Sequence, residues 1–579
     1  MKYLAIILVA VLAVLIVVFI SWFLNMKANG KCPICALKKI FIPTKLTIDI
    51  SEDEEYSENK VAQTPPMGWS SWNTFRNNID QDIIMQTAHA MKDSGLANAG
   101  YEFINLDDCW QSSLRDSDGK LQGDLGTFSR GIPKLIKDIN ALGLKVGLYS
   151  SNGTLTCEDL PASLGNERLD AKTIASWGCE FFKYDFCHHD RISGDCPAIE
   201  HIVITKPKSA FEIDLRPEDA EFTGRAKIIK MSDVPSKKAI GFISHGSGSA
   251  SFNFDADEKG EYVLTFVFHK SMAKKKQYMQ IHINGKMYEI FFPETKGFSP
   301  LGRQQIIVEL KEGINNMTIK NPVATAIDSS YIQYKRMGNA LKEASSMWAK
   351  VTHSEEKPIT YSICEWGMAR PYLWGAKAGS MWRTTPDIAP NWRSITMIYN
   401  RTLKLYKYSG PGHWNDPDML EVGNGKLDDN ENRAHFSLWC MLAAPLMLGN
   451  DIRSFVSNGI PDKDNETLKI VTNKHMIAVD QDSLGKSAKR IKKESGIDII
   501  ARPLSNGDVA LCLFNTASST KSVNFKLEEL TKDPYLGIEE SPSGYELHDL
   551  WTDERSTGTT INATIPKHST VVYRVKPTI

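Results

Sequence analysis

Short apolar runs alternate with helix-like stretches along much of this chain, and this alternation restricts the fold more than any other feature. Strand-like runs cover Tyr101 to Leu106, Lys145 to Tyr149, Glu180 to Phe186 and Ile359 to Trp366, and the stretch from Gln81 to Asp93 is amphipathic and helix-like. Strands that alternate with helices build a parallel sheet, which closes into a barrel or stays open. We therefore predict an α/β fold from about residue 65 onward.

The α/β pattern is interrupted between residues 197 and 333. There the chain changes to alternating polar and apolar residues with hairpin turns, as in Lys259 to Phe268 and Ile281 to Lys286. Helical α/β character returns at Met337 and continues to about Gly485, after which further strand-like runs follow. We expect an α/β domain in two parts, residues 65–196 and 334–484, with an inserted β-sandwich at 197–333 and a β domain at 485–579.

Composition supports several globular domains. The chain has 579 residues, 42% hydrophobic and 24% charged, which is an ordinary globular mixture and not that of a disordered or coiled-coil chain. Its formal net charge of -1 gives no basic field, so nucleic acid is not an expected partner. Ten cysteines are too few for a disulfide-built scaffold.

The N-terminus contains a long apolar segment. Leu4 to Leu24 is apolar apart from Ser21 and is long enough to cross a bilayer, so we predict a transmembrane helix that anchors the chain within residues 1–30. A cleaved signal peptide is the alternative, although no Ala-x-Ala-like site follows the segment. Residues 31–64 are predicted to be a linker, and its acidic stretch from Asp49 to Gln63 lacks an apolar periodicity.

The expected localisation is a membrane-anchored protein with an extracellular catalytic body. The lysines after the apolar segment oppose that orientation, because positive charge favours the cytoplasmic side. These residues are Lys27, Lys31, Lys38 and Lys39.

Acidic residues follow three of the predicted strands. Asp107 and Asp108, Asp185, and Asp387 each stand where an apolar run ends, and carboxyl ends of barrel strands form one active-site face. A helix cap or a surface ion pair is the ordinary role of a single aspartate. Three such positions favour catalysis, and hydrolysis of a glycosidic bond requires two carboxyl groups.

At these positions the chain resembles glycoside hydrolase family 27, the α-galactosidases and α-N-acetylgalactosaminidases. The resemblance implies a (β/α)8 TIM barrel followed by a C-terminal antiparallel β-sandwich. Six ordered motifs carry it: Pro65 to Asn73, Leu106 to Trp110, Lys183 to Cys187, Cys364 to Gly367, Trp382 to Ile388 and Gly410 to Leu420.

The resemblance also implies the catalytic chemistry. Asp185 would be the nucleophile and Asp387 the general acid/base of a double displacement with retention, releasing terminal α-linked D-galactose from a galactosylated oligosaccharide or glycoconjugate. No catalytic cofactor or metal is implied. The substrate-binding residues would be Trp69, Asp107, Asp108, Tyr149, Lys183, Cys364, Glu365, Trp366, Met368 and Arg383.

Two physical expectations accompany these roles. Positive charge on Lys183 and Arg383 is expected to lower the pKa of the nucleophile. Met368 and Glu365 stand where members that cleave N-acetylgalactosamine have smaller residues, which favours galactose over that sugar. β-L-Arabinopyranosidase and α-N-acetylgalactosaminidase activities remain alternatives within enzymes, and a non-catalytic glycan-binding protein is the alternative from another class.

The resemblance pairs Cys157 with Cys187 in a disulfide. Where family members have a cysteine after the Trp-Asn motif, this chain reads Phe75 to Asn78, so Cys109 is expected to be a free thiol. The insert resembles a family 35 carbohydrate-binding module, a class that often binds calcium, so a structural calcium ion is an expectation there without assigned ligands. A sandwich that only shapes the barrel entrance is the alternative.

Overall fold

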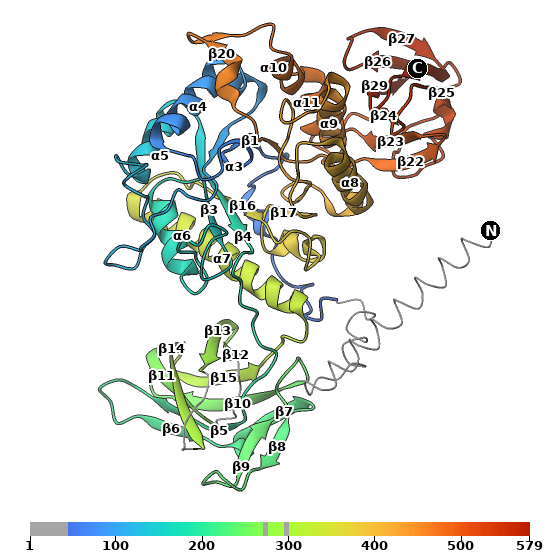
Figure 1. The fold of residues 1–579 in the computed structure, drawn as a ribbon. Coiled ribbons are helices and arrows are strands. Elements are labelled where there is room, and N and C mark those ends of the chain that lie inside the picture. The colour runs from blue at the N-terminus through green and yellow to red at the C-terminus, as the bar shows by residue number, and fades with distance from the viewer. Residues whose placement is uncertain (1–44, 270–275, 294–299, 579) are drawn as a thin grey trace, which may run out of the picture. The chain divides into compact units, whose positions relative to one another are not determined.

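The computed structural model describes residues 45–269, 276–293 and 300–578 (Figure 1). The predicted membrane anchor and the first part of the linker lie outside these residues. Within the described ranges, no helix has the length and apolar character needed to cross a membrane. The chain forms two compact units, one containing Ile192–Asp328 together with residues 45–48, and the other containing Asp49–Arg191 and Ser329–Ile579.

Eight parallel strands form the centre of the larger unit. They run in chain order around the sheet, and β1 also pairs in parallel with β19. A parallel bridge between Leu420 and Leu448 joins the segment after β18 to β19, giving the cyclic order of a TIM-like barrel. The strands are β1 (Met67–Ser70), β2 (Phe103–Asn105), β3 (Lys145–Ser151), β4 (Phe181–Asp185), β16 (Thr360–Ile363), β17 (Met381–Arg383), β18 (Trp414–Asp416) and β19 (Leu446–Leu448).

The longer helices that follow the strands have an apolar stripe, which is buried when the helix packs against the rest of the unit. In α4, Ile84, Ala88 and Met91 are buried at helical spacing, and the Asp80 carboxylate caps the helix by accepting from Ile83 N–H at 2.8 Å. The predicted helix over Gln81 to Asp93 is confirmed. The α-helices are α3 (Trp72–Phe75), α4 (Gln81–Asp93), α5 (Ile132–Ala141), α6 (Glu167–Ser176), α7 (Ala326–Thr352), α8 (Trp392–Thr402), α9 (Asp429–Met441), α10 (Glu466–Val471) and α11 (Lys474–Asp480).

The smaller unit is antiparallel. One sheet has the order β13-β12-β15-β10-β7 and the other β14-β11-β5-β9-β8, with β6 paired to β5. Alternate residues such as Phe252, Phe266 and Ile281 are buried in a shared apolar core. The strands are β5 (Ile199–Thr205), β6 (Glu212–Leu215), β7 (Glu221–Gly224), β8 (Lys227–Lys230), β9 (Lys238–Gly241), β10 (Gly248–Ala256), β11 (Gly260–His269), β12 (Gln277–Ile283), β13 (Lys286–Phe292), β14 (Leu301–Leu310) and β15 (Gly313–Lys320).

The predicted C-terminal antiparallel sheets are also present. A six-stranded sheet has the order β22-β23-β24-β29-β26-β27, and β25 pairs with β28. Leu511, Phe525 and Ile565 contribute to the apolar core of this region. The strands are β22 (Lys489–Glu494), β23 (Ile497–Pro503), β24 (Val509–Asn515), β25 (Lys521–Lys526), β26 (Tyr545–Asp549), β27 (Arg555–Gly558), β28 (Thr560–Ile565) and β29 (Thr570–Pro577); a short pair, β20 (Val456–Ser457) and β21 (Ile460–Pro461), precedes them.

The stretch from Asp49 to Gln63 is not the solvated linker that the sequence suggested. Tyr56 is buried, and its hydroxyl donates to Ile359 O at 2.7 Å. Ala62 O accepts a hydrogen bond from Trp414 Nε1 at 2.8 Å. The segment contains only one 3-10 turn, Tyr56–Asn59, and a few side-chain and backbone contacts hold it to the barrel, so no apolar periodicity in the sequence reveals it.

Candidate active site

The predicted acidic residues meet at the carboxyl ends of the barrel strands. A cavity of about 370 Å³ opens there and receives side chains that follow β1, β2, β3, β4, β16, β17 and β18. Its lining residues are Trp72, Asn73, Arg76, Asp107, Asp108, Tyr149, Cys157, Lys183, Asp185, Trp366, Arg383, Asp387, Ile388, Ala389, Pro390, Asp418, Met419 and Glu421.

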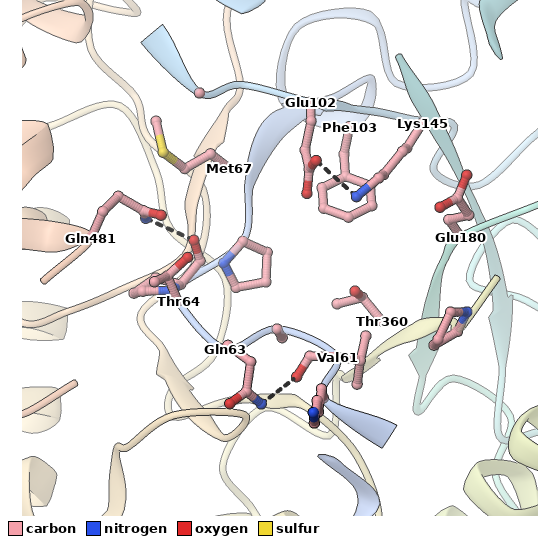
Figure 2. Close-up of a pocket in the computed structure, with 16 residues that line it drawn as sticks. Val61, Gln63, Thr64, Met67, Glu102, Phe103, Lys145, Glu180, Thr360 and Gln481 are labelled. Carbon is pink, nitrogen blue, oxygen red and sulfur yellow. Dashed lines mark hydrogen bonds and ion pairs between the residues drawn. The ribbon is translucent and has the colours of Figure 1, made fainter. Parts of the chain in front are cut away.

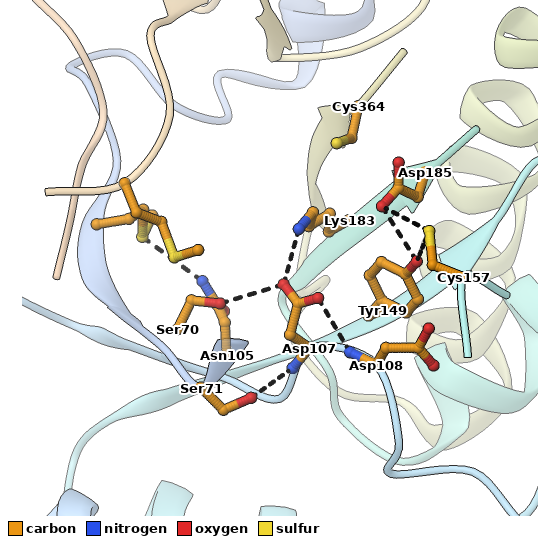
Figure 3. Close-up of polar contacts among 12 residues, drawn as sticks. Ser70, Ser71, Asn105, Asp107, Asp108, Tyr149, Cys157, Lys183, Asp185 and Cys364 are labelled. Atoms are coloured by element: carbon orange, nitrogen blue, oxygen red, sulfur yellow. Dashed lines mark hydrogen bonds and ion pairs between the residues drawn. The ribbon is translucent and has the colours of Figure 1, made fainter. Parts of the chain in front are cut away.

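Asp107 and Lys183 form a buried ion pair at one side of the cavity (Figure 3). Lys183 Nζ lies 2.8 Å from Asp107 Oδ2, which also accepts from Ser70 Oγ at 3.3 Å. Burial would lower the pKa of Lys183, but the nearby carboxylates, Asp107 first, hold it well above its usual range. The lysine therefore remains an ammonium donor facing the cavity.

Asp108 follows directly and is held by backbone donors. Its Oδ1 accepts from Cys109 N–H at 2.8 Å and its Oδ2 from Glu158 N–H at 3.0 Å. Burial nevertheless raises the pKa of Asp108 to about 6. Of the two adjacent carboxyl groups at the cavity, Asp107 is thus paired with an ammonium group and Asp108 with backbone N–H donors.

Asp185 is the last residue of β4 and is almost completely buried. Its Oδ2 accepts from the Tyr149 hydroxyl at 3.1 Å (Figure 3). Its Oδ1 accepts from Phe186 N–H at 2.8 Å. These donors fix the orientation of the carboxylate toward the cavity. Burial raises the pKa of Asp185, and the Lys183 ammonium opposes that effect without reversing it. The expectation that neighbouring cations give this aspartate a lowered pKa is therefore wrong, because the energetic cost of burying the charge is larger.

Arg383 on β17 links two further carboxylates. Its Nη2 lies 2.9 Å from Asp387 Oδ1 and 2.7 Å from Asp418 Oδ2. Arg383 and Asp418 are buried, whereas the Asp387 side chain is 72% exposed. The arginine therefore holds one deep carboxylate and one that faces the open part of the cavity.

Several lining residues were missed from the sequence. Glu421 is buried and accepts from Asn73 Nδ2 at 2.5 Å and from Asn424 Nδ2 at 2.6 Å, and burial raises its pKa to about 7. Both Asp418 and Glu421 follow β18, Asp418 within the motif from Gly410 to Leu420 and Glu421 directly after it. Because β18 has only three residues, two of them polar, no apolar run in the sequence marks the strand end before them.

Four predicted binding residues do not line the cavity. Trp69 is 0% exposed within β1, with its Nε1 donating to Asn450 O at 2.8 Å, whereas Trp72 lines the cavity. The end of β1 explains this difference, since Trp69 lies inside the strand and Trp72 lies beyond it. Cys364 and Glu365 are buried and are not among the residues that line the cavity. The Met368 side chain, which is 63% exposed, is not among them either. The preference for galactose that was inferred from Met368 and Glu365 stays a prediction.

The disulfide between Cys157 and Cys187 is present. It joins the loop after β3 to the residues just after β4, and Cys157 Sγ lies 3.6 Å from Asp185 Oδ2. Cys109 is a free, half-buried thiol, as expected from the missing partner. The bridge therefore braces the strand end that carries Asp185.

A second cavity of about 290 Å³ lies at the opposite ends of the strands (Figure 2). It is lined by residues that begin strands, including Phe103 and Lys145, and Lys145 forms an ion pair with Glu102 at 2.8 Å. Gln481 Nε2 donates to Pro65 O at 2.8 Å across it. In barrels of this type the N-terminal face contributes to stability and the carboxyl face to chemistry, so we place the active site in the first cavity.

Buried carboxylates, the exposed carboxylate of Asp387 and two cations around one cavity of a TIM-like barrel suit the hydrolysis of a glycosidic bond, the chemistry of the glycoside hydrolases. A family model described as "Alpha galactosidase A" matches residues 64–202 and 324–482, and one for the "Alpha galactosidase C-terminal beta sandwich domain" matches residues 494–575. The chain belongs to the α-galactosidase family, glycoside hydrolase family 27.

Individual relatives agree with this assignment. The chain is 31% identical over 526 residues to an α-galactosidase of Cyamopsis tetragonoloba, covering 90% of this chain and 88% of that one. It is 30% identical over 544 residues to α-galactosidase 2 of Arabidopsis thaliana, covering 92% and 96%. Among solved structures, α-galactosidase I from Mortierella vinacea matches with a TM-score of 0.61 at 25% identity, covering 90% of this chain and 99% of that one. The enzyme hydrolyses galactosides.

Proposed function

We propose that this protein is a retaining, exo-acting α-galactosidase that uses Asp185 as nucleophile and Asp387 as general acid/base. The observation that carries the proposal is the placement of these two carboxylates on one cavity, Asp185 buried at the end of β4 and Asp387 exposed after β17. Double displacement needs one oriented carboxylate that attacks and one carboxyl group that exchanges a proton with the leaving oxygen and then with water.

The surrounding contacts suit that division of roles. Tyr149 O–H and Phe186 N–H fix Asp185, so its oxygens are held for attack on the anomeric carbon. Arg383 holds Asp387 at the open part of the cavity, where a departing alcohol leaves and water enters. Lys183 and Asp107 supply a donor and an acceptor for sugar hydroxyl groups. Catalysis in this family needs no cofactor.

The stereochemistry of the product tests this mechanism. Proton NMR during hydrolysis of 4-nitrophenyl α-D-galactopyranoside should show α-galactose forming first, followed by mutarotation. Initial formation of β-galactose would contradict a double displacement. Asp185→Asn should lower kcat by several orders of magnitude, and azide should restore turnover in Asp387→Ala with an α-galactosyl azide product.

The sugar specificity is tested by a substrate panel. α-Galactoside, β-L-arabinopyranoside and α-N-acetylgalactosaminide with the same nitrophenyl leaving group should give the highest kcat/KM for the galactoside. A structural neighbour, a β-L-arabinopyranosidase from Geobacillus stearothermophilus, shares the fold with a TM-score of 0.56 at 16% identity. A preference for arabinopyranoside would reassign the substrate while leaving the two catalytic residues in place.

Two further proposals rest on the sequence. The inserted sandwich is proposed to bind glycan with the aid of calcium. Affinity electrophoresis of the whole protein in galactan gels, with and without calcium chelator, would test this proposal.

The segment from Leu4 to Leu24 is proposed to anchor an extracellular enzyme in a membrane. Recovery of activity in the carbonate-washed membrane fraction, with an intact N-terminus, is the expected result; a secreted product lacking this segment would contradict it.

A further inference from the structure

Two histidines and an aspartate converge away from the active-site cavity. His475 is near the start of α11, His548 lies in β26, and Asp553 is in the turn between β26 and β27. One ligand atom from each side chain lies within 4.8 Å of the other two. The group therefore joins a helix that follows the barrel to a hairpin of the C-terminal sheet.

The distances suit a shared cation. His548 Nε2 lies 2.6 Å from Asp553 Oδ1, and His475 Nε2 lies 3.3 Å from the same oxygen. Zn²⁺ binds imidazole nitrogen at about 2.0–2.1 Å and carboxylate oxygen at about 2.0–2.2 Å, so neighbouring tetrahedral ligands lie roughly 3.3–3.6 Å apart. One distance already has this value, and the other needs only a small outward rotation of the exposed Asp553 side chain.

The hydrogen-bonding state of His475 provides an independent observation. Its Nε2 is buried, and its 3.3 Å contact with Asp553 Oδ1 does not have the geometry of a hydrogen bond. A buried polar atom of this kind normally has a partner.

The backbone around the cluster is well supported. Asn473 Oδ1 accepts from His475 N–H at 2.9 Å, and Asn473 Nδ2 donates to Leu550 O at 3.0 Å in the turn. Asp553 N–H donates to Asp549 O at 3.0 Å. Helix and turn are therefore already held together before any ion binds, which reduces the ordering that binding requires.

We propose that His475, His548 and Asp553 form a binding site for a borderline divalent transition metal, with Zn²⁺ as the representative ion. Two nitrogen ligands with one oxygen favour Zn²⁺ over Ca²⁺ or Mg²⁺, which prefer shells made of oxygen. The exposed side of Asp553 leaves room for water as a fourth ligand. The site lies outside the lining of the catalytic cavity, so its role is to clasp the C-terminal hairpin to α11.

The test is a titration of the metal-stripped, full-length protein with ZnCl₂. We expect one saturable equivalent and a rise in Tm with zinc concentration, because an ion that binds only the folded state stabilises it. His475→Gln and Asp553→Asn should each weaken binding by about tenfold or more, since even partners that only orient ligands contribute that much. His353→Gln, which changes an exposed histidine outside the cluster, is the matched control.

Cobalt substitution distinguishes this site from the cysteines. The bound Co²⁺ should show d–d absorption without a thiolate charge-transfer band. Three outcomes would each overturn the proposal. They are a titration with no saturable equivalent of zinc, a thiolate charge-transfer band in the cobalt spectrum, and unchanged affinity in both His475→Gln and Asp553→Asn. In the first case the three side chains form only a hydrogen-bonded cluster. Galactosidase activity should be the same with and without zinc.

Discussion

Lys183 Nζ lies 2.8 Å from Asp107 Oδ2, so a cation on β4 and a carboxylate after β2 form an ion pair past the strand between them, β3. The two partners act in opposite directions on the proposed nucleophile. Lys183 lowers the pKa of Asp185, whereas Asp107 raises it. One ion pair therefore adjusts the charge state of a third residue.

Substitutions of this pair should move the acidic limb of the pH–rate profile in opposite directions. The nucleophile must be ionised, so activity is lost as pH falls through its pKa. Lys183→Gln should raise that pKa and shift the limb of kcat/KM to higher pH, and Asp107→Asn should shift it to lower pH. Both variants should also lose activity, because each removes a proposed contact with a sugar hydroxyl. Shifts of the same sign would contradict this electrostatic coupling.

Glu365 gives a prediction about stability. It is 0% exposed, and burial raises its pKa to about 8, above the ordinary value of 4.5. The folded state then retains a proton that the unfolded state releases, so stability falls as pH rises from about 4.5 to about 8. Glu365→Gln should remove this loss, which amounts to several kcal/mol at about 1.4 kcal/mol per pKa unit.

Thermal unfolding at two pH values measures the effect of Glu365. The variant should have a higher Tm than the parent at pH 8 and an equal Tm at pH 4. A difference of similar size at both pH values would mean that packing, and not ionisation, is responsible.

The disulfide should matter for both stability and rate. Cys157 and Cys187 close a loop with a sequence separation of 30 residues, for which the chain-entropy model gives about 3 to 4 kcal/mol. Replacing both with serine should lower Tm and also kcat, because the bridge lies beside Asp185. Cys109→Ser removes a free thiol near the same cavity and is the control. Unchanged kcat in the double variant would limit the bridge to a structural role.

Arg76 suggests a preference in the leaving group. It lines the cavity, is exposed, and forms no ion pair with any residue that the structure describes. A free guanidinium at a cavity attracts anions. Arg76→Gln should lower kcat/KM several-fold for 4-carboxyphenyl α-galactoside relative to the unsubstituted phenyl galactoside.

The matched control for Arg76 is Arg401→Gln, which removes the same charge from an exposed position outside the lining. The ratio of the two rate constants should fall in Arg76→Gln alone and should recover in Arg76→Lys. Equal ratios in the two glutamine variants would assign any effect to net charge.

Much of the fold could be predicted because local pattern and global arrangement agree. The helix over Gln81 to Asp93 has an apolar stripe and an aspartate cap, and strands such as β2 and β4 lie within the strand-like runs that the sequence shows. Asp107 and Asp185 were found because they follow such runs. Asp418 follows β18, whose three residues include two polar ones, so no apolar run marked its position in the sequence.

Other features depend on geometry that a linear pattern does not contain. Whether Trp69 or Trp72 faces the cavity depends on where β1 ends, and that boundary is set by pairing with β2 and β19. The pKa of Asp185 depends on how completely the folded chain removes water from it. Tyr56 is buried by a distant segment that receives its hydrogen bond. Each of these follows from tertiary packing.

The interruption of the barrel has a consequence for biosynthesis. Strands β1 to β4 leave the ribosome before residues 192–328, and β16 to β19 leave after them. At about 5–20 residues per second, the first half of the barrel waits on the order of ten seconds for its partners. The inserted sandwich is contiguous, and Asn321 Nδ2 ties its two ends by donating to Ser193 O at 3.0 Å. Folding of the insert during synthesis would thus shorten the effective loop that the two halves of the barrel must close.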